Sequence, residues 1–412
     1  MKIDQLIEEA ESALRETFNR IDENERIRTL RVLDAFRSEH VSYRHFAPTT
    51  GYGYDDIGRD TLERIYASVF HTDAALMRPH VASGTAALSL TLFGMTRPGD
   101  RIISATGLPY DTLHGVIGIG NNPAPGSLKE QGVSFDYVDL KDGKIDVNSV
   151  EHAINHNTTL IIAQRSRGYS WRPSLFPEDF EELADMIHTR HPRIRLMVDN
   201  CYGEFVCSDE PTDYGADLCV GSLIKNPGGG IAPTGGYVVG GKEDIERIAG
   251  RLTAPGLCRE LGSYAGSYRP FYQGFFMAPH TVAQALKTAL LASRIFENIG
   301  LNTSPASDER RADIIQAIQL QTPERLVAFC QGIQAVSPVD SMAMPEPWDM
   351  PGYDDQVVMA AGTFVAGASI ELSADGPMRS PYTAYMQGGL TYIHGKIAMA
   401  EALRRMFPDQ LL

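Results

Sequence analysis

Apolar residues recur at two different intervals along the chain. Near the N-terminus Leu6, Leu14 and Phe18 stand at helical spacing, and no proline interrupts residues 4–39, so we expect two helices there. Between residues 80 and 240, short apolar runs alternate with helical stretches. Alternation of strands and helices predicts a largely parallel sheet that helices cover on both faces.

The expected strands of this sheet are short and rich in apolar residues, as buried strands are. Each is followed by a loop or a helical stretch, which fits parallel strands joined by crossovers. The strands are predicted at 101–105, 133–138, 158–163, 194–198, 216–220 and 237–239, and helices at 61–70, 150–154 and 177–188.

The pattern changes beyond residue 250, where Gly, Tyr and Phe become frequent before a long helix with few charges. The remainder reads as helices, an apparent hairpin and a last helix, which implies a small α+β domain. We therefore divide the chain into an N-terminal helical arm (1–50), a large domain (51–280) and a small C-terminal domain (281–412). The helices are predicted at 281–299, 307–321, 323–336 and 392–406, with a strand-like run at 363–372.

Composition narrows the class of protein. The chain has 412 residues, 43% of them hydrophobic, and a net charge of −15, which supports a sizeable core and argues against nucleic acid as a partner. The five cysteines show no zinc-binding spacing, and no apolar run is long enough to cross a membrane. We expect no metal site, a cytoplasmic protein with reduced thiols, and a small molecule as its partner.

Two polar residues of reactive type follow predicted strands. Asp199 ends the run 194–198, and Lys225 comes shortly after the run 216–220. Open α/β sheets bind ligands at the carboxyl ends of their strands, so both side chains are expected in one crevice. There a lysine can form a Schiff base with pyridoxal 5'-phosphate, while a carboxylate keeps the pyridine nitrogen protonated. The pair predicts a pyridoxal phosphate site.

A phosphate cradle is a second candidate feature. Ser83-Gly84-Thr85 stands at the start of a predicted helix, where free backbone N–H groups favour an anion. The same tripeptide is also an ordinary helix N-cap. Tyr110 follows the strand 101–105 and can either stack on a ring or close the edge of the core.

Several arginines stand near predicted strand ends. Arg165, Arg167 and Arg172 follow the strand 158–163, which predicts binding of a phosphate or a carboxylate, or else a solvated basic loop.

Two further candidates stand in other loops. Arg379 can hold a substrate carboxylate through two parallel hydrogen bonds, or pair with Asp375 or Glu371. The glycine-rich loop that contains Tyr52 and Tyr54 is either a binding loop or a connector.

In order and spacing, Ser83-Gly84-Thr85, Tyr110, Asp199, Ser222 and Lys225 resemble fold-type I pyridoxal phosphate enzymes. Three stretches resemble the core of the cysteine/methionine metabolism enzymes, which include cystathionine lyases and methionine γ-lyase. They are VDNCYGEF, YGADLCVGSLIKNPGG and GGYVVGG. The likeness to the aluminium resistance or methionine γ-lyase family is closer still and extends over nearly the whole chain. It is carried by the stretches GYGYDDIGRDTLE, PYDTL, QRSRGYSWRPSL and SADGPMRSPYTAYMQGGLTY. It implies an α/β fold-type I pyridoxal phosphate transferase fold, with a mostly parallel seven-stranded sheet and a smaller α+β domain.

The resemblance also implies roles for individual residues. Lys225 would carry the cofactor and move protons, and we expect it to be neutral part of the time because of burial and cationic neighbours. Asp199 would pair with the pyridine nitrogen, and Tyr110 would stack on the ring and protonate the leaving group.

The remaining implied roles concern the phosphate, the substrate and the partner subunit. Tyr52 or Tyr54 would reach a neighbouring subunit's site in a homodimer or homotetramer. Ser83, Gly84, Thr85 and Ser222 would bind the phosphate, and Arg379 and Arg167 the substrate carboxylate.

The chain departs from the better-known lyases at the phosphate. Leu223 and Ile224 follow Ser222, so one hydroxyl is missing before the lysine, and the loop of Tyr52 lacks the arginine of those enzymes. Arg59 or Arg167 would then meet the phosphate charge. The asparagine-proline motif is also absent, with Gly168-Tyr169 near that point.

Together these features predict a carbon–sulfur lyase that eliminates a thiol from a sulfur-containing amino acid and leaves a 2-oxo acid and ammonia. Two alternatives remain open: transamination, aldol cleavage or γ-replacement on the same fold, and a non-catalytic metal-response protein.

Overall fold

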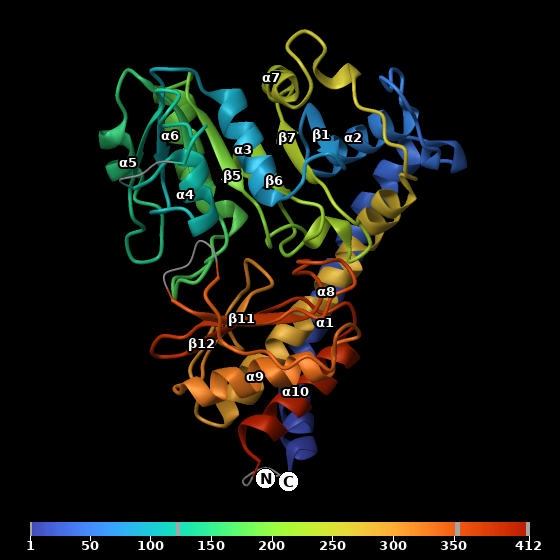
Figure 1. Cartoon of the computed structure of the whole chain (residues 1–412), viewed down its shortest axis with the longest axis vertical. Coiled ribbons are helices and arrows are strands. Elements are labelled where there is room, and N and C mark those ends of the chain that lie inside the picture. The colour runs from blue at the N-terminus through green and yellow to red at the C-terminus, as the bar shows by residue number, and fades with distance from the viewer. Residues whose placement is uncertain (1, 121–123, 351–354, 409–412) are drawn as a thin grey trace.

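Seven strands between residues 74 and 240 form one sheet in the upper half of the molecule (Figure 1), in the order β1-β7-β6-β5-β4-β2-β3. Strand β7 is antiparallel to both of its neighbours, and the other pairs are parallel. The computed structural model describes residues 2–120, 124–350 and 355–408. The strands are β1 (Ala74–Arg78), β2 (Arg101–Ser104), β3 (Ser134–Tyr137), β4 (Thr158–Gln164), β5 (Arg195–Asp199), β6 (Leu218–Ser222) and β7 (Gly236–Gly240). This confirms the predicted α/β fold with a mostly parallel sheet.

Helices cover both faces of this sheet, because successive residues of each strand point to opposite sides. In β4, Leu160 and Ile162 enter one core while Ile161 and Ala163 enter the other. One face packs on α3 (Gly84–Met95), α4 (Asp111–Ile117) and α7 (Lys242–Leu252), and the other on α2 (Ile57–Val69), α5 (Val147–Ala153) and α6 (Glu181–Arg190).

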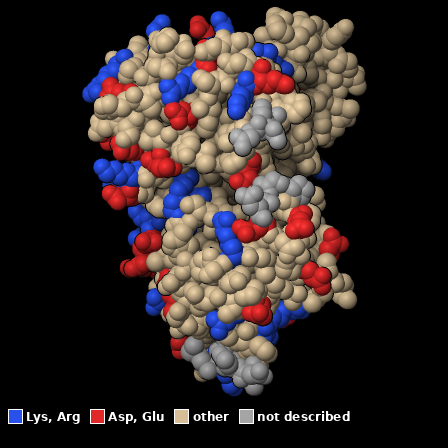
Figure 2. Space-filling view, turned by 60° about the vertical axis from the view of Figure 1, so that its left-hand side comes forward, with Lys and Arg blue, Asp and Glu red and all other residues tan. Residues whose placement is uncertain are grey.

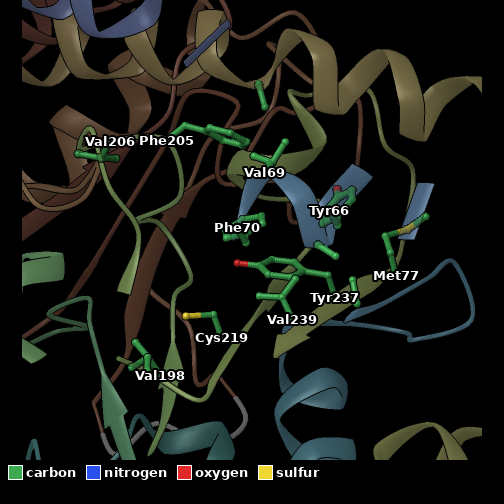
Figure 3. Packing of buried hydrophobic residues seen from close by; sticks show 14 of the residues in the cluster. Tyr66, Val69, Phe70, Met77, Val198, Phe205, Val206, Cys219, Tyr237 and Val239 are labelled. Atoms are coloured by element: carbon green, nitrogen blue, oxygen red, sulfur yellow. The ribbon is translucent and has the colours of Figure 1, made fainter. Parts of the chain in front are cut away.

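The core on the second face is built around aromatic rings. Figure 3 shows the ring of Tyr237 beside Phe70 and Tyr66, with centroids 5.3 and 5.7 Å away respectively. The Tyr237 hydroxyl donates a hydrogen bond to Glu204 Oε1 at 2.9 Å. This packing holds β7 against α2.

A second sheet of five strands occupies the lower half of the molecule, in the order β10-β11-β12-β9-β8, and all its pairs are antiparallel (Figure 1). Helices α9 (Pro323–Ala335) and α10 (Tyr392–Met406) pack on it, at almost the predicted residues. The strands are β8 (Thr303–Ser304), β9 (Gln316–Gln319), β10 (Val357–Ala360), β11 (Ser373–Pro377) and β12 (Thr383–Gln387).

Two predictions in this region were wrong. Residues 307–321 contain strand β9 instead of a helix, because a nearly continuous buried run suits a central strand as well as a helix. Residues 363–372 form no strand, because the Glu371 carboxylate accepts the backbone N–H groups of Phe364 and Val365, both at 2.9 Å. The strand starts one residue later, as β11.

The N-terminal region is one helix, α1 (Ile3–Ser38), and not the two that we predicted. Its polar middle stays helical because side chains there are bound: Asn24 donates to the Val206 carbonyl at 2.8 Å, and Arg26 pairs with Glu23 at 2.6 Å. Helix α1 packs along α8 (Arg269–Asn298), which begins twelve residues before the predicted start at 281.

The surface carries no single dominant charge on the face seen in Figure 2, where acidic and basic side chains are interspersed. Among the described residues, no helix is both long enough and apolar enough to span a lipid bilayer.

Candidate active site

The fold brings Asp199 and Lys225 into one cavity. Asp199 is the last residue of β5, and it lies opposite Val220 in the parallel strand β6. Lys225 follows three residues after β6 ends at Ser222, at the start of a short turn of 3-10 helix. Both line a cavity of about 680 Å³ whose walls come from both sheets.

Lys225 lies on the face of an aromatic ring, with Nζ 4.0 Å from the centroid of Tyr202. Burial by itself would lower the lysine pKa, but Cys201, Tyr202 and Asp199 together raise it well above its usual value. We had expected cationic neighbours to lower this pKa, but the groups that act most strongly on the ammonium are acids and aromatic hydroxyls, which raise it. In this structure the lysine is therefore held protonated.

Asp199 is buried, and burial raises its pKa while Lys225 lowers it. Its Oδ1 accepts the backbone N–H of Cys201 at 3.1 Å. The carboxylate is thus oriented by its own loop and is balanced by the lysine, an arrangement in which it can pair with a second cationic group.

The tripeptide Ser83-Gly84-Thr85 lies at the start of α3, beside the end of β6. Ser83 is the N-cap, and its Oγ accepts the backbone N–H of Ala86 at 3.0 Å. A Cβ on Gly84 would lie 3.2 Å from Cβ of Ser222. The Ser222 hydroxyl is buried, and it lacks a hydrogen-bond partner within the described part of the chain. The two features that we proposed for phosphate therefore adjoin, around one unsatisfied hydroxyl.

Tyr110 also lines the cavity, and its position is fixed at both ends. Its hydroxyl lies 3.1 Å from the hydroxyl of Thr85, which lies 3.2 Å from that of Thr112. Its backbone N–H donates to Oε1 of Gln164 at 3.1 Å. Burial, followed by the negative charge of Asp199, raises the pKa of the phenol, so it is a proton donor at neutral pH.

The three arginines after β4 separate in the structure. Arg165 is fully buried outside the cavity, where it donates to Asn200 Oδ1 at 2.7 Å and lies 3.5 Å from Glu210. Arg167 and Arg172 line the cavity.

The two cavity arginines differ in how they are satisfied. Arg172 donates to the backbone carbonyls of Pro173, Gln164 and Ser166. Arg167 is 2% exposed and donates to Ser304 Oγ at 2.9 Å, while its Nε is buried with no partner in the described chain. Arg167 is thus the better placed of the two to receive an anion.

Arg379 lines the cavity at its rim and pairs with Asp355 at 3.0 Å. The predicted alternative pairing with Asp375 or Glu371 is therefore wrong. Its side chain is 56% exposed, so it can turn toward a ligand without breaking a buried contact.

Three other predicted residues lie outside the cavity of their own chain. Tyr52 and Tyr54 are exposed, with ring centroids 5.6 Å apart. Arg59 is buried and donates to the Gly53 carbonyl at 2.8 Å and to Asp60 at 2.7 Å, so it holds the tyrosine loop in place.

Sequence reasoning did not identify several residues of the cavity, among them Gln164, Cys201, Tyr202 and Asp375. Two of them follow Asp199 closely, and Tyr202 has a φ of 72°, which is rare for a residue with a side chain. Their place directly after a strand end was an available signal. Asp375 had none, because only the second sheet's position brings it here.

No group of three or more His, Cys, Asp or Glu side chains is arranged to hold a metal ion in the ranges that the structure describes.

Known proteins resemble this chain both in sequence and in structure. The chain is 51% identical over 383 residues to the uncharacterized protein YnbB of Bacillus subtilis, which covers 93% of this chain and 91% of that protein. The structure matches that of a carbon-sulfur lyase involved in aluminum resistance from Clostridium novyi NT, with a TM-score of 0.94 and 49% identity over 98% and 96% of the two chains.

A more distant match shows how widely the fold occurs. The pyridoxal-5'-phosphate dependent protein YhfS from Escherichia coli has a TM-score of 0.63 at 16% identity, over 94% of this chain and 97% of that one. Residues 3–407 match the model of the methionine gamma-lyase family. The chain therefore belongs to the methionine gamma-lyase family.

Proposed function

We propose that this protein is a pyridoxal 5'-phosphate-dependent carbon–sulfur lyase acting on a sulfur-containing amino acid. The observation that carries the proposal is the meeting of Asp199, Lys225 and Tyr110 in one cavity, on the fold of a lyase family. The name of the Clostridium novyi relative, a carbon-sulfur lyase, supports the same reaction type.

The residues present fit the cofactor. The unsatisfied Ser222 hydroxyl and the start of α3 at Gly84 and Thr85 offer donors to a phosphate. The missing side chain of Gly84 lets these groups approach closely, because a Cβ there would lie 3.2 Å from Cβ of Ser222. Asp199 would accept a hydrogen bond from a protonated pyridine nitrogen, and Lys225 would be the amine to which the cofactor aldehyde is attached.

When bound, the cofactor supplies an electron sink that makes the α-proton of the amino acid acidic. Lys225 would accept that proton at Nζ in its neutral form, once it has lost the proton that its raised pKa favours, and would return it later. Asp199 would stay ionised beside the pyridine nitrogen. Tyr110, whose raised pKa keeps its proton in place, donates to the departing sulfur. Arg167, or Arg379 after release from Asp355, holds the α-carboxylate.

The overall reaction balances without an oxidant or an amino acceptor. The carbon–sulfur bond at the β or γ carbon breaks, the sulfur leaves with the electron pair and takes a proton, and water hydrolyses the remainder to a 2-oxo acid and ammonia.

We also propose a homodimer or homotetramer in which the exposed Tyr52 or Tyr54 completes the site of a neighbouring subunit. That the protein is cytoplasmic also remains a prediction from its sequence.

The test is to load the purified protein with pyridoxal phosphate and record its visible absorption, then to assay thiol, 2-oxo acid and ammonia together from methionine and cystathionine. We expect an absorption band that Lys225→Ala removes, and equal amounts of the three products without added keto acid. A colourless protein would overturn the cofactor assignment. Turnover that requires a keto acid would identify a transaminase instead.

A further inference from the structure

Glu204 is a buried acid that the proposed mechanism does not use. It lies in the loop after β5, two residues beyond Tyr202, and it is 0% exposed and does not line the cavity. Its Oε1 accepts a hydrogen bond from the Tyr237 hydroxyl at 2.9 Å, and its Oε2 is buried with no hydrogen-bond partner among the described residues. One oxygen of this carboxyl group is therefore unsatisfied in the core.

The carboxyl group of Glu204 has no ion-pair partner in the part of the chain that the structure describes. Arg165 pairs with Glu210 at 3.5 Å instead, and Lys225 lies on the ring of Tyr202. Burial raises the pKa of Glu204 to about 8, so at pH 7 the group is a neutral acid with an O–H donor. The ionisable groups that act on it, or on which it acts, are Lys225, Arg165, Glu210, Cys201, Cys219, Tyr66 and Tyr237.

The residue after Lys225 carries a matching acceptor. Asn226 is fully buried, and its Nδ2 donates to the backbone carbonyl of Glu204 at 2.9 Å. Its Oδ1 is also buried and lacks a hydrogen-bond partner within the described residues. The side chains of Asn226 and Glu204 thus each leave one oxygen without a donor at the same junction, which is unfavourable in a core. A proton on Glu204 Oε2 would satisfy both oxygens.

This junction joins the two segments that carry the reactive pair. Glu204 belongs to the loop that follows Asp199, and Asn226 belongs to the short turn that begins at Lys225. The carboxyl group also packs directly on β6, because a Cβ on Gly221 would lie 2.5 Å from Glu204 Oε1. A hydrogen bond at this junction therefore sets the position of Lys225 relative to Asp199 from behind the cavity.

We propose that Glu204 is a positioning residue, whose neutral carboxyl group donates from Oε2 to Asn226 Oδ1 and so holds the turn of Lys225 on the loop of Asp199. The inference rests on the proposed function, since it concerns the lysine to which the cofactor would be attached. Ionisation of Glu204 removes the donor. The bond is therefore present below the Glu204 pKa of about 8 and is lost as the pH rises through it.

The experiment measures hydrogen–deuterium exchange of residues 223–229 in the full-length protein before cofactor is added. In this segment the N–H of Gly228 donates to the Lys225 carbonyl at 3.1 Å, so its exchange reports whether the turn is closed. Glu204→Gln keeps a neutral donor and an acceptor, whereas Glu204→Met keeps only the volume. At pH 7 we expect the glutamine variant to exchange like the wild type and the methionine variant about tenfold faster. At pH 9 the wild type should exchange faster than the glutamine variant.

Two further variants test the partner and the specificity of the effect. Asn226→Leu removes the acceptor and should give the same increase, which Glu204→Met should not enlarge in the double variant. Glu243→Met, at an exposed glutamate of α7, is the matched control and should leave the exchange unchanged. If the methionine variant does not fold, as checked by circular dichroism, the comparison of wild type and glutamine variant at pH 9 decides.

Three results would overturn the proposal. One is equal exchange of the glutamine and methionine variants at pH 7. Another is wild-type exchange in the methionine variant, which would show that Glu204 only fills space. The third is equal exchange of the wild type and the glutamine variant at every pH up to 10, which would show that the donated proton does not come from Glu204.

Cofactor binding separates this proposal from the proposed function. Equilibrium titration with pyridoxal phosphate at pH 7 should give equal dissociation constants for the wild type and Glu204→Gln, and one about tenfold larger for Glu204→Met. If the protein binds no pyridoxal phosphate, the proposed function fails, while the exchange measurement still decides the role of Glu204. Equally tight binding by all three proteins would overturn that role and leave the lyase assignment intact.

Discussion

At the scale of single residues, the proposed phosphate site depends on Gly84, which has no side chain. Gly84 lies where a Cβ would be 3.2 Å from Cβ of Ser222 and 3.6 Å from Sγ of Cys201. We predict that Gly84→Ala weakens pyridoxal phosphate binding about tenfold, equivalent to about 1.4 kcal/mol, because the added methyl group presses on Cβ of Ser222 and shifts the hydroxyl that it carries. Equilibrium titration of cofactor absorbance measures this dissociation constant.

Gly115→Ala is the matched control for this change. Gly115 also lies in a helix near the cavity, but a Cβ there would meet nothing within 4 Å. It should leave the dissociation constant unchanged. Equal effects of the two substitutions would show that the close approach at Gly84 does not matter for the cofactor.

The protonation of Lys225 gives a second prediction at this scale. Only the neutral amine attacks the cofactor aldehyde, and its neighbours Cys201, Tyr202, Asp199 and Tyr110 raise the lysine pKa. The rate of cofactor incorporation into the apoprotein should therefore rise with pH, by about tenfold per unit below that pKa. Asp199→Asn removes a negative charge, which lowers the lysine pKa and speeds incorporation at pH 7. Stopped-flow absorbance measures both, and a rate independent of pH would contradict the assignment.

At the scale of elements, a buried ion pair joins α2, β1 and the segment before α8. Arg78 of β1 contacts Glu63 of α2 at 2.8 Å and donates to the Leu261 carbonyl at 2.7 Å, while Arg259 contacts the other oxygen of Glu63 at 3.3 Å. Both members of the first pair are almost fully buried. The pair holds the edge of the large sheet next to the loop of Tyr52, since Tyr52 accepts a backbone hydrogen bond from Gly262 at 3.0 Å.

Removing Arg78 leaves the buried Glu63 with Arg259 as its remaining ionic partner, at 3.3 Å, and takes a donor from the Leu261 carbonyl. We predict that Arg78→Leu destabilises the fold by about 3–5 kcal/mol, measured as a lower midpoint of urea unfolding. Arg37→Leu breaks an exposed pair with Asp34 at 3.5 Å and should change stability by less than about 0.5 kcal/mol. Similar midpoints for the two variants would mean that the buried pair does not stabilise the fold.

At the scale of the whole molecule, two long helices connect the sheets. Helix α1 places Leu6 in the core of the second sheet and Val32 in the core of the first. Helix α8 does the same, with Phe271 in one core and Phe296 in the other (Figure 1). The cavity lies between the sheets, so these helices set its dimensions.

This arrangement predicts that the two halves unfold together. Leu6 is fully buried, and Leu6→Ala should cost about 2–5 kcal/mol. Scanning calorimetry should show one transition at a lower temperature, and the substitution of the exposed neighbour Glu8→Ala should not shift it. A second transition that appears only in Leu6→Ala would show that the halves are independent.

Six of the seven strands of the first sheet could be predicted from the sequence, because most of them are short apolar runs bounded by polar loops, as in residues 194–198 and 216–220; β1 (Ala74–Arg78) was not among the predicted strands. The spacing of Asp199 and Lys225 from these strands indicated a shared crevice, because parallel neighbours end at one edge of a sheet. Periodicity failed at residues 307–321, where burial on all sides removes the difference between helix and strand.

What only the tertiary structure decided is which residues from distant segments share the cavity. The raised pKa of Lys225 follows from the groups that act on its Nζ, among them Cys201, Tyr202 and Asp199. The separation of Arg165 from Arg167 and the approach of Asp375 depend on packing between segments about 35 to 200 residues apart, which local pattern does not encode. The sequence by itself determined the sheet and the reactive pair, since both depend on local periodicity, whereas contacts across the two sheets determined the charges around the substrate.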